Sequence, residues 1–300
     1  MHKIILHEVG PRDGLQMEKE TVPLEFKIKW IQAGMDAGID IVQVGSFVNP
    51  QKVPQMADTD KLCAHFMQPG MKPKAVILSA LVLNEKGVDR GMACNVEMFC
   101  MGVSASETHS RKNTGMGISE ALTRIIAMAK VVQAAGKKVQ VSVQSAFGCG
   151  YEGAVPEGRV IEIVGRYLEA GVRAISLADT AGHATPDRVE KLFAALRQLD
   201  DQVECACHFH NTYGLGLANC YAAMCAGVGY FESAFAGLGG CPFTAVAGGN
   251  VCTEDLVHML QHMNLRHDVK LEELTRIAAD VSRFFKRELL GVVYNTGAIP

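Results

Sequence analysis

The feature of this sequence that most constrains its fold is an alternation of short β-branched runs with longer segments of helical periodicity. Strand-like runs occur at Ile4–Val9, Ile41–Gly45, Lys74–Leu81, Asn95–Met101, Lys138–Ser145, Ala174–Ala178, Val203–Phe209 and Tyr230–Ala234. Segments with helical periodicity lie between them, at Leu24–Ala37, Ser119–Ala135, Pro156–Ala170, Pro186–Leu199 and Leu215–Ala226. Such alternation is typical of parallel sheets, in which a helix connects each strand to the next.

The predicted helices have recognisable ends. A glycine that can adopt the left-handed cap conformation follows several of them: Gly38, Gly136, Gly171 and Gly227. Pro186 suits the first turn of its helix, and Thr185 before it suits the N-cap position. Ala-Gly followed by Ile or Val recurs before three of the strands, which indicates the same helix-to-strand corner each time.

Eight strand-like runs in 300 residues predict an α/β fold, a (β/α)₈ TIM barrel, whose usual size is about 250 residues. A doubly wound sheet is the alternative, but the first strand runs into Gly10-Pro11-Arg12-Asp13-Gly14 and not into a Gly-x-Gly-x-x-Gly turn. Residues 264–300, with helical periodicity at Leu271–Leu289, are predicted as extra C-terminal helices. We therefore expect residues 1–300 to form a single TIM-barrel domain.

Charge and composition restrict the function classes. The formal net charge is −3 and no long basic run occurs, so neither nucleic acid nor a membrane surface is an expected partner. The start lacks a signal-peptide pattern, and no apolar run approaches the ~20 residues that span a bilayer. The ten cysteines form neither a disulfide framework nor a paired Cys-x-x-Cys zinc pattern, which predicts reduced thiols in a cytoplasmic protein.

Two histidines stand at the end of the seventh predicted strand. Because successive strand side chains point to opposite faces, His208 and His210 share a face and can bind one metal ion. The small residues after them turn the chain into a helix, which places the pair at a C-terminal strand end, where barrels of this kind keep their chemistry. The alternative is that both are ordinary strand-edge histidines.

Other strand ends bring further polar residues to the same mouth of the predicted barrel. They are Arg12, Asp13, Gln43, Ser46, Gln144, Asp179, Thr180 and Asn250. Asp13 and Asn250 could join the two histidines in a mixed nitrogen and oxygen set, which suits Mg²⁺ or Mn²⁺ better than a closed structural zinc site. Alternatively, Asp13 caps a loop or pairs with Arg12, Asn250 caps a helix, and Asp179 is a turn residue.

Arg12 and Cys241 are candidates for handling charge and protons. A guanidinium beside a divalent cation is unfavourable unless an anion binds between them, which points to a substrate that develops an enolate. Pairing of Arg12 with Glu8 or Glu18 is the alternative. Cys241 ends a glycine-rich loop, so it could act as a general acid or base or lie on a lid. A buried structural cysteine is the alternative.

Several motifs recur in a familiar order over nearly the whole chain. They are Glu8-Val9-Gly10-Pro11-Arg12-Asp13-Gly14-Leu15-Gln16, Ser46-Phe47-Val48-Asn49-Pro50, Val53-Pro54-Gln55-Met56, Asp179-Thr180, His208-Phe209-His210-Asn211-Thr212-Tyr213-Gly214, Ala236–Pro242 and Gly249–Val257. Together they resemble the 3-hydroxy-3-methylglutaryl-CoA lyases, within the wider superfamily of metal-dependent lyases and synthases. The resemblance implies a TIM barrel with a divalent metal ion at its C-terminal mouth.

This resemblance also implies roles and a reaction. The metal ligands would be Asp13, His208, His210 and Asn250. The catalytic residues would be Arg12, which stabilises an enolate, Cys241, which assists proton transfer, Asp179 and His208. Predicted substrate-binding residues are Gln16, Gln43, Ser46, Gln144 and Thr180. The implied reaction is the retro-Claisen cleavage of a 3-hydroxy-3-substituted-glutaryl-CoA to acetyl-CoA and a keto acid. The expected partners are the acyl-CoA substrate and a second copy of the chain in a homodimer.

The sequence departs from the lyase pattern near the predicted site. Gln43 stands where these lyases usually carry Glu, Gln140 lies near a position that is often basic, and Asn211 replaces the usual Asp. An amide can form hydrogen bonds but cannot accept a proton at neutral pH. Around an intact metal core, these changes favour a lyase for a related 3-hydroxyacyl-CoA over strict 3-hydroxy-3-methylglutaryl-CoA specificity.

Two alternative functions stay open. A Claisen-type synthase, like the isopropylmalate or homocitrate synthases, shares the barrel and the metal motifs, but Gly239-Gly240-Cys241-Pro242 is lyase-like. The other alternative is a metal-binding family member that has lost catalysis. Basic residues after the fourth strand, Arg111 and Lys112, could meet CoA phosphates or could belong to an exposed, solvated loop.

Overall fold

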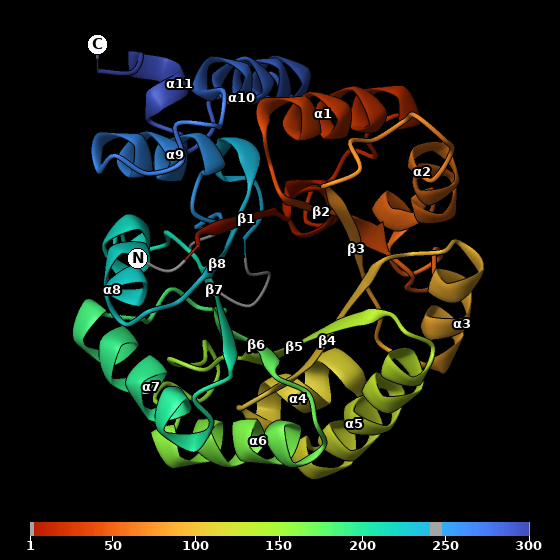
Figure 1. Cartoon of the computed structure of the whole chain (residues 1–300), viewed down its shortest axis with the longest axis vertical. Coiled ribbons are helices and arrows are strands. Elements are labelled where there is room, and N and C mark those ends of the chain that lie inside the picture. The colour runs from red at the N-terminus through yellow and green to blue at the C-terminus, as the bar shows by residue number, and fades with distance from the viewer. Residues whose placement is uncertain (1–2, 241–247, 300) are drawn as a thin grey trace.

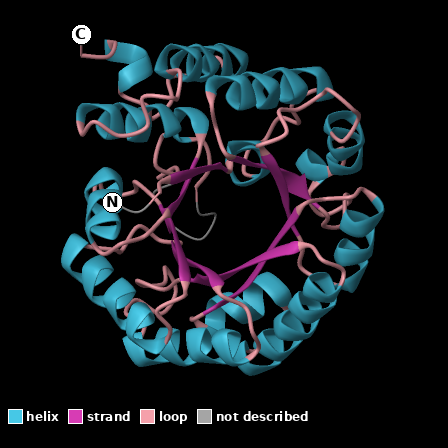
Figure 2. Cartoon of the chain, viewed as in Figure 1, coloured by secondary structure: helices cyan, strands magenta, loops and turns pink. Residues whose placement is uncertain are grey.

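Eight parallel strands form a closed barrel in the computed structural model, which describes residues 3–240 and 248–299. The strands are β1 (Ile5–Glu8), β2 (Ile41–Ser46), β3 (Ile77–Leu81), β4 (Met98–Ser104), β5 (Lys138–Gln144), β6 (Ala174–Asp179), β7 (Glu204–Phe209) and β8 (Tyr230–Ser233). Each strand pairs with its neighbours in sequence, and β1 pairs with β8 to close the ring. Figure 2 shows the strands arranged as a ring inside the helices. The predicted (β/α)₈ barrel is confirmed.

Helices surround the ring of strands (Figure 1). They are α1 (Leu24–Ala37), α2 (Thr59–Phe66), α3 (Glu85–Ala93), α4 (Glu107–Thr114), α5 (Ile118–Ala134), α6 (Glu157–Glu169), α7 (Pro186–Leu199), α8 (Gly216–Cys225), α9 (Thr253–His262), α10 (Leu271–Phe285) and α11 (Val293–Thr296). Shorter turns of helix are η1 (Gly10–Gly14), η2 (Pro54–Met56) and η3 (Phe235–Gly237). In the described part of the chain, no helix is both long and apolar enough to cross a membrane.

The helices α2, α3 and α4 were not predicted from periodicity. α4 consists of polar residues, so it has no apolar stripe that could reveal it. Side-chain caps mark two of the three helices instead. Oδ1 of Asn84 accepts from the N–H of Gly87 at 2.9 Å, and Oγ of Ser106 accepts from that of His109 at 3.1 Å. The interpretation of residues 111–113 as a solvated loop was therefore wrong, because they lie in α4.

The predicted helix ends are largely confirmed. Gly38, Gly136, Gly171 and Gly227 all have positive φ, as left-handed caps require. Pro186 opens α7 and Thr185 occupies its N-cap position. However, the Thr185 side chain makes no capping bond to the helix, because its hydroxyl bonds to the carboxylate of Asp187 instead.

The C-terminal helices pack on the outside of the barrel beside α1 (Figure 1). The ring of Phe284 in α10 lies 5.0 Å from that of Phe26 and 5.6 Å from that of Trp30. Nε1 of Trp30 donates to Oδ2 of Asp280 at 2.8 Å, which satisfies the one polar atom of a fully buried side chain. The extra helices predicted for this segment are therefore present and share an aromatic cluster with α1.

The barrel interior contains a polar layer beneath its C-terminal mouth. Nε2 of His7 on β1 lies 2.8 Å from Oγ of Ser79 on β3, and Gln140 on β5 bonds to Glu232 on β8. Barrels of this type more often fill this space with Val, Ile and Leu. Burying polar groups is unfavourable unless they are hydrogen-bonded. The layer therefore indicates that this end of the barrel supports a polar site.

Candidate metal and substrate site

A cavity of about 270 Å³ opens at the C-terminal mouth of the barrel. Many of the residues predicted from sequence line it: Arg12, Asp13, Gln16, Gln43, Gln144, Thr180, His208 and His210. The acidic side chains in the described part of its wall are Asp13 and Glu232. Strand ends that are far apart in sequence therefore meet here, as the fold prediction required.

The turn η1 positions Arg12 and Asp13 directly after β1. The N–H groups of Arg12, Asp13 and Gly14 all point to the carbonyl oxygen of Val9, at 3.0, 2.7 and 3.4 Å. This geometry is a single π-helical turn, a form that occurs frequently at functional sites. It sends the side chains of two consecutive residues in different directions. Arg12 reaches β2, while Asp13 faces β7.

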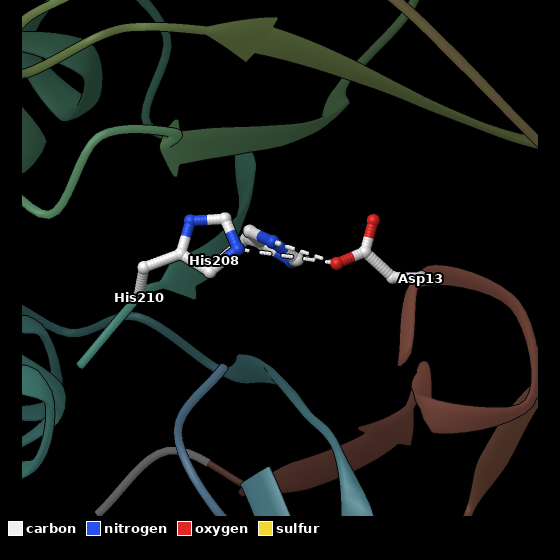
Figure 3. Close-up of side chains that lie close together, drawn as sticks. All are labelled: Asp13, His208 and His210. Carbon is white, nitrogen blue, oxygen red and sulfur yellow. Dashed lines mark ion pairs between the residues drawn. The ribbon is translucent and has the colours of Figure 1, made fainter. Parts of the chain in front are cut away.

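The imidazoles at the end of β7 face the carboxylate of Asp13 (Figure 3). Nε2 of His208 and Nε2 of His210 each lie 3.9 Å from Oδ2 of Asp13, and one candidate ligand atom from each residue lies within 4.8 Å of the others. Ligand atoms around one ion lie roughly 3–4 Å apart, because each is about 2.1 Å from the ion. Small side-chain adjustments would therefore let the three residues hold one divalent ion.

Hydrogen bonds behind the two rings determine which nitrogen faces the cavity. Nδ1 of His210 lies 2.9 Å from the backbone oxygen of Asp179, and Nδ1 of His208 lies 3.0 Å from Oε2 of Glu232. Both partners are acceptors, so the proton of each neutral ring belongs on Nδ1. The lone pair on each Nε2 is then directed toward Asp13, as metal ligation requires.

Asn250 completes this group from the segment after β8. Its Nδ2 donates to Oδ2 of Asp13 and to the backbone oxygen of Leu238, both at 2.9 Å. Its Oδ1 and Nε2 of His210 are buried without a hydrogen-bond partner among residues 3–240 and 248–299. Buried acceptors without partners are rare. A cation at Asp13 would satisfy Nε2 of His210, and it would satisfy Oδ1 of Asn250 once the amide turned this oxygen toward Asp13 in place of Nδ2. A divalent metal therefore fits the donor set. The helix-cap alternative for Asn250 does not occur, since the N-cap of α9 is Cys252.

The charges of the site favour a cation. Burial alone would raise the pKa of Asp13, but the guanidinium of Arg12 and the two imidazoles hold it well below its usual value. Burial would also raise the pKa of Glu232, but the hydrogen bond and charge of His208 lower it to about 2. Both carboxylates are therefore ionised at neutral pH, on either side of the His208 ring.

Arg12 lies between the carboxylate of Asp13 and strand β2. Its Nε donates to Oε1 of Gln43, and its Nη1 pairs with Oδ1 of Asp13. The other partners considered from sequence are occupied elsewhere. Glu8 accepts from two backbone N–H groups and a threonine hydroxyl, and Glu18 pairs with an arginine after α10. Arg12 therefore presents its charge at the cavity wall.

The side chain of Asp179 holds a turn, and its predicted catalytic role stays a prediction. Its two carboxylate oxygens accept the N–H groups of His183 at 2.7 Å and Ala184 at 3.0 Å. This is the turn role weighed as the alternative, since both oxygens hold the loop after β6. The backbone oxygen of Asp179 meets the site directly and positions His210.

The side chain of Ser46, which was predicted to bind substrate, is bonded to the end of strand β3. Oγ of Ser46 donates to the backbone oxygen of Leu81 at 3.3 Å, and Ser46 is absent from the cavity wall. Thr180 keeps its place in the wall, with its Oγ1 accepting from the N–H of Ser145. Cys241 lies outside the described residues.

Sequence reasoning missed Glu232, which pairs in register with His208 across β7 and β8. A signal was present, because Glu232 is a charged residue inside the short strand Tyr230–Ser233. Charged side chains are almost never buried in a barrel strand unless they are paired. The sequence could therefore have flagged Glu232, although not the residue that it contacts.

Comparisons with known proteins extend over nearly the whole chain. A family model described as HMGL-like matches residues 3–281. A hydroxymethylglutaryl-CoA lyase of Bacillus subtilis is 36% identical over 276 residues, which cover 92% of this chain and 91% of that protein. The mitochondrial hydroxymethylglutaryl-CoA lyase of Bos taurus is 38% identical over 280 residues, which cover 93% and 85% of the two chains.

Solved structures of HMG-CoA lyases are also similar to this chain over nearly its whole length. The crystal structure of the HMG-CoA lyase from Bacillus subtilis matches with a TM-score of 0.93 at 34% identity and covers 98% of both chains. The structure of an HMG-CoA lyase from Acinetobacter baumannii, in complex with coenzyme A and 3-methylmalate, matches with a TM-score of 0.91 at 32% identity. It covers 99% of this chain and 98% of that one.

Proposed function

This chain belongs to the HMGL-like family and is a carbon–carbon lyase, and on that premise we propose that it cleaves 3-hydroxy-3-methylglutaryl-CoA or a close relative in a metal-dependent reaction. The bond between C2 and C3 of the acyl group breaks. The C3 hydroxyl loses its proton and becomes the ketone of a keto acid. The electron pair of the broken bond moves to C2 as an enolate, which is protonated to give acetyl-CoA.

One observation carries this proposal. Asp13, His208 and His210 present ligand atoms to one point, and Asn250, from a third part of the chain, and the guanidinium of Arg12 both contact Asp13 there. Open coordination positions toward the cavity would accept a substrate with adjacent hydroxyl and carboxylate oxygens. The mixed donor set supports Mg²⁺ or Mn²⁺ as the ion.

The residues around this point have complementary tasks in the proposed reaction. When bound, the divalent ion would supply positive charge that lowers the pKa of the substrate hydroxyl. Arg12 would place a fixed positive charge where the thioester oxygen becomes negative, and Gln43 holds its Nε in that orientation. Cys241 is proposed as the thiol that protonates the enolate carbon, a role that rests on its position in the lyase-like motif.

Helix α4 supports an acyl-CoA as the substrate. It begins three residues after β4 ends, which places it at the cavity mouth, and His109 and Asn113 on it line the cavity. Nζ of Lys112, the neighbour of Asn113 in the sequence, lies 3.9 Å from the centre of the Tyr151 ring, which orients this cation. We propose that Lys112 and Arg111 meet CoA phosphates. The Acinetobacter lyase structure, which holds coenzyme A and 3-methylmalate, supports the same class of ligand.

A metal-reconstitution assay tests the function. The protein, stripped of metal with EDTA, is mixed with Mg²⁺ or Mn²⁺ and with a panel of 3-hydroxy-3-substituted-glutaryl-CoAs, and acetyl-CoA release is followed. We expect release only with metal. His208→Ala should abolish it, whereas His262→Ala, a histidine on the outer helix α9, should not. Asp13→Ala should behave like His208→Ala.

The same assay separates the alternatives. Release of free CoA from acetyl-CoA and a 2-keto acid, without cleavage of any hydroxyacyl-CoA, would identify a synthase. Stoichiometric metal binding without any turnover on the panel would identify a member that has lost catalysis. The homodimer and the cytoplasmic location stay predictions, which size-exclusion chromatography with light scattering and cell fractionation would test.

A further inference from the structure

Strand β8 carries a buried carboxylate directly beneath the candidate metal site. The Glu232 side chain is 8% exposed, and its two oxygens have different partners. Oε2 lies 3.0 Å from Nδ1 of His208, while Oε1 accepts a hydrogen bond from Nε2 of Gln140. Glu232 is therefore held from both sides and cannot turn away from the histidine without breaking a buried hydrogen bond.

The Nδ1 atoms of the two histidines therefore have hydrogen-bond partners of different charge. Nδ1 of His210 is held by the neutral backbone oxygen of Asp179, but Nδ1 of His208 is held by a carboxylate. A carboxylate behind an imidazole fixes the ring orientation and the tautomer and increases the basicity of the opposite nitrogen. His208 is therefore the more strongly donating of the two ligands toward a cation at Asp13.

Gln140 fixes Glu232 without cancelling its charge. It reaches across the barrel from β5 to β8, between residues 92 positions apart in sequence. Gln140 lies near a position that is often basic in the lyases that the sequence resembles, and a cation here would compete with His208 for the carboxylate. A neutral amide satisfies one oxygen and leaves the negative charge to the imidazole.

We propose that Glu232 is a positioning residue, which keeps His208 in its Nδ1–H tautomer and strengthens metal binding through the Glu232 charge, and that Gln140 holds Glu232 in place. The metal-binding part of this proposal rests on the metal dependence of the proposed function. The tautomer part concerns the metal-free protein and can be tested alone.

Three variants distinguish the effect of Glu232 on the orientation of the His208 ring from the effect of its negative charge. Glu232→Gln keeps an oxygen that can accept from Nδ1 of His208, with the Gln140 amide reversed to present its own oxygen. Glu232→Ala removes both the charge and the acceptor, and Gln140→Leu leaves the charge but frees the carboxylate. Glu254→Gln is the control for replacing a buried glutamate side chain by glutamine. It changes another fully buried glutamate, whose oxygen bonds to the N–H of Ala236 rather than to a histidine.

The first measurement is the tautomer of His208 in metal-free protein, from ¹⁵N chemical shifts of histidine-labelled samples, with His208→Ala identifying the signal. The native protein, Glu232→Gln and Glu254→Gln should show the Nδ1–H form. Glu232→Ala should show a mixture or the Nε2–H form. A pure Nδ1–H signal in Glu232→Ala would overturn the orienting role.

The second measurement is the affinity for Mn²⁺ by titration calorimetry. We expect binding about 10–100-fold weaker in Glu232→Ala, the usual effect of losing such an outer partner, with a smaller loss in Glu232→Gln and Gln140→Leu. The control should match the native protein. Native affinity in both Glu232 variants would overturn the charge role. Failure of the native protein to bind Mn²⁺ would instead contradict the proposed function.

Discussion

Nε of Arg12 donates a hydrogen bond to Oε1 of Gln43, which joins the turn η1 to strand β2 at the cavity wall. Gln43 is 1% exposed and neutral. Among the described hydrogen-bond partners of Arg12, Asp13 is therefore the one whose negative charge opposes the guanidinium. A guanidinium with this arrangement keeps much of its charge for a substrate oxygen. The residue at position 43 should therefore tune how Arg12 meets negative charge on the substrate.

Replacing Gln43 tests this relationship. Gln43→Glu restores the carboxylate usual in the lyases and turns the hydrogen bond from the Arg12 guanidinium into an ion pair, which takes up part of the Arg12 charge but fixes the guanidinium more firmly, by about 1 kcal/mol, in the orientation that the lyases use. We expect kcat/KM for 3-hydroxy-3-methylglutaryl-CoA to rise about fivefold relative to other 3-hydroxyacyl-CoAs. Gln198→Glu, an exposed glutamine on the outer helix α7, is the control. An unchanged ratio would remove Gln43 as a determinant of substrate choice.

Replacing Asn250 with aspartate should make the stability of the protein depend on bound metal. Nδ2 of Asn250 donates to Asp13 and to a backbone oxygen, so Asn250→Asp would place a second carboxylate against two acceptors. We expect a loss of about 1–3 kcal/mol in unfolding free energy in EDTA, as for other unsatisfied buried groups. The loss should shrink when Mn²⁺ is added. Denaturant unfolding with and without metal measures it, and an equal loss in both conditions would argue against ligation at this residue.

Cys241→Ser should separate metal binding from proton transfer. The variant should bind Mn²⁺ with native affinity, because the ligand set does not include the thiol. Its kcat should fall by about 100-fold or more, as expected when a general acid is lost. Cys225→Ser, an exposed cysteine, is the control. Full activity of Cys241→Ser would show that the thiol takes no part in the reaction.

Glu254 should make the protein less stable as the pH rises. Burial raises its pKa to about 8, and the neighbouring charges of Asp255 and Glu8 act in the same direction. The folded protein therefore keeps a proton on Glu254 between about pH 4.5 and 8 that the unfolded chain has lost, so the free energy of unfolding falls as pH rises through this range.

Glu254→Gln mimics the protonated form of this carboxyl and should reduce that fall. The midpoint of thermal unfolding, measured from pH 5 to pH 9, should decline less steeply in the variant than in the native protein. Part of the decline should remain, because burial also raises the pKa of Glu8 to about 7. Parallel curves for the two proteins would contradict the assignment to Glu254.

Residues in regular elements were predictable because their patterns are local. The bounds of α1 and α7 followed from apolar periodicity, and the shared face of His208 and His210 followed from the alternation of a strand. Polar α4 could not be found in this way, since its start depends on a single capping bond from Ser106. Ser46 was predicted from its place at a strand end, which could not reveal that its hydroxyl bonds to the backbone of β3.

By itself, the sequence determined that eight strand ends converge and that Asp13, both histidines and Asn250 belong to that end of the barrel. Only the tertiary structure decided which side chains touch. Gln140 meets Glu232, and Glu232 meets His208, because of the register in which the closed sheet pairs its strands. Periodicity specifies the face on which a side chain lies, but contacts across the barrel depend on register and side-chain length, which no local pattern contains.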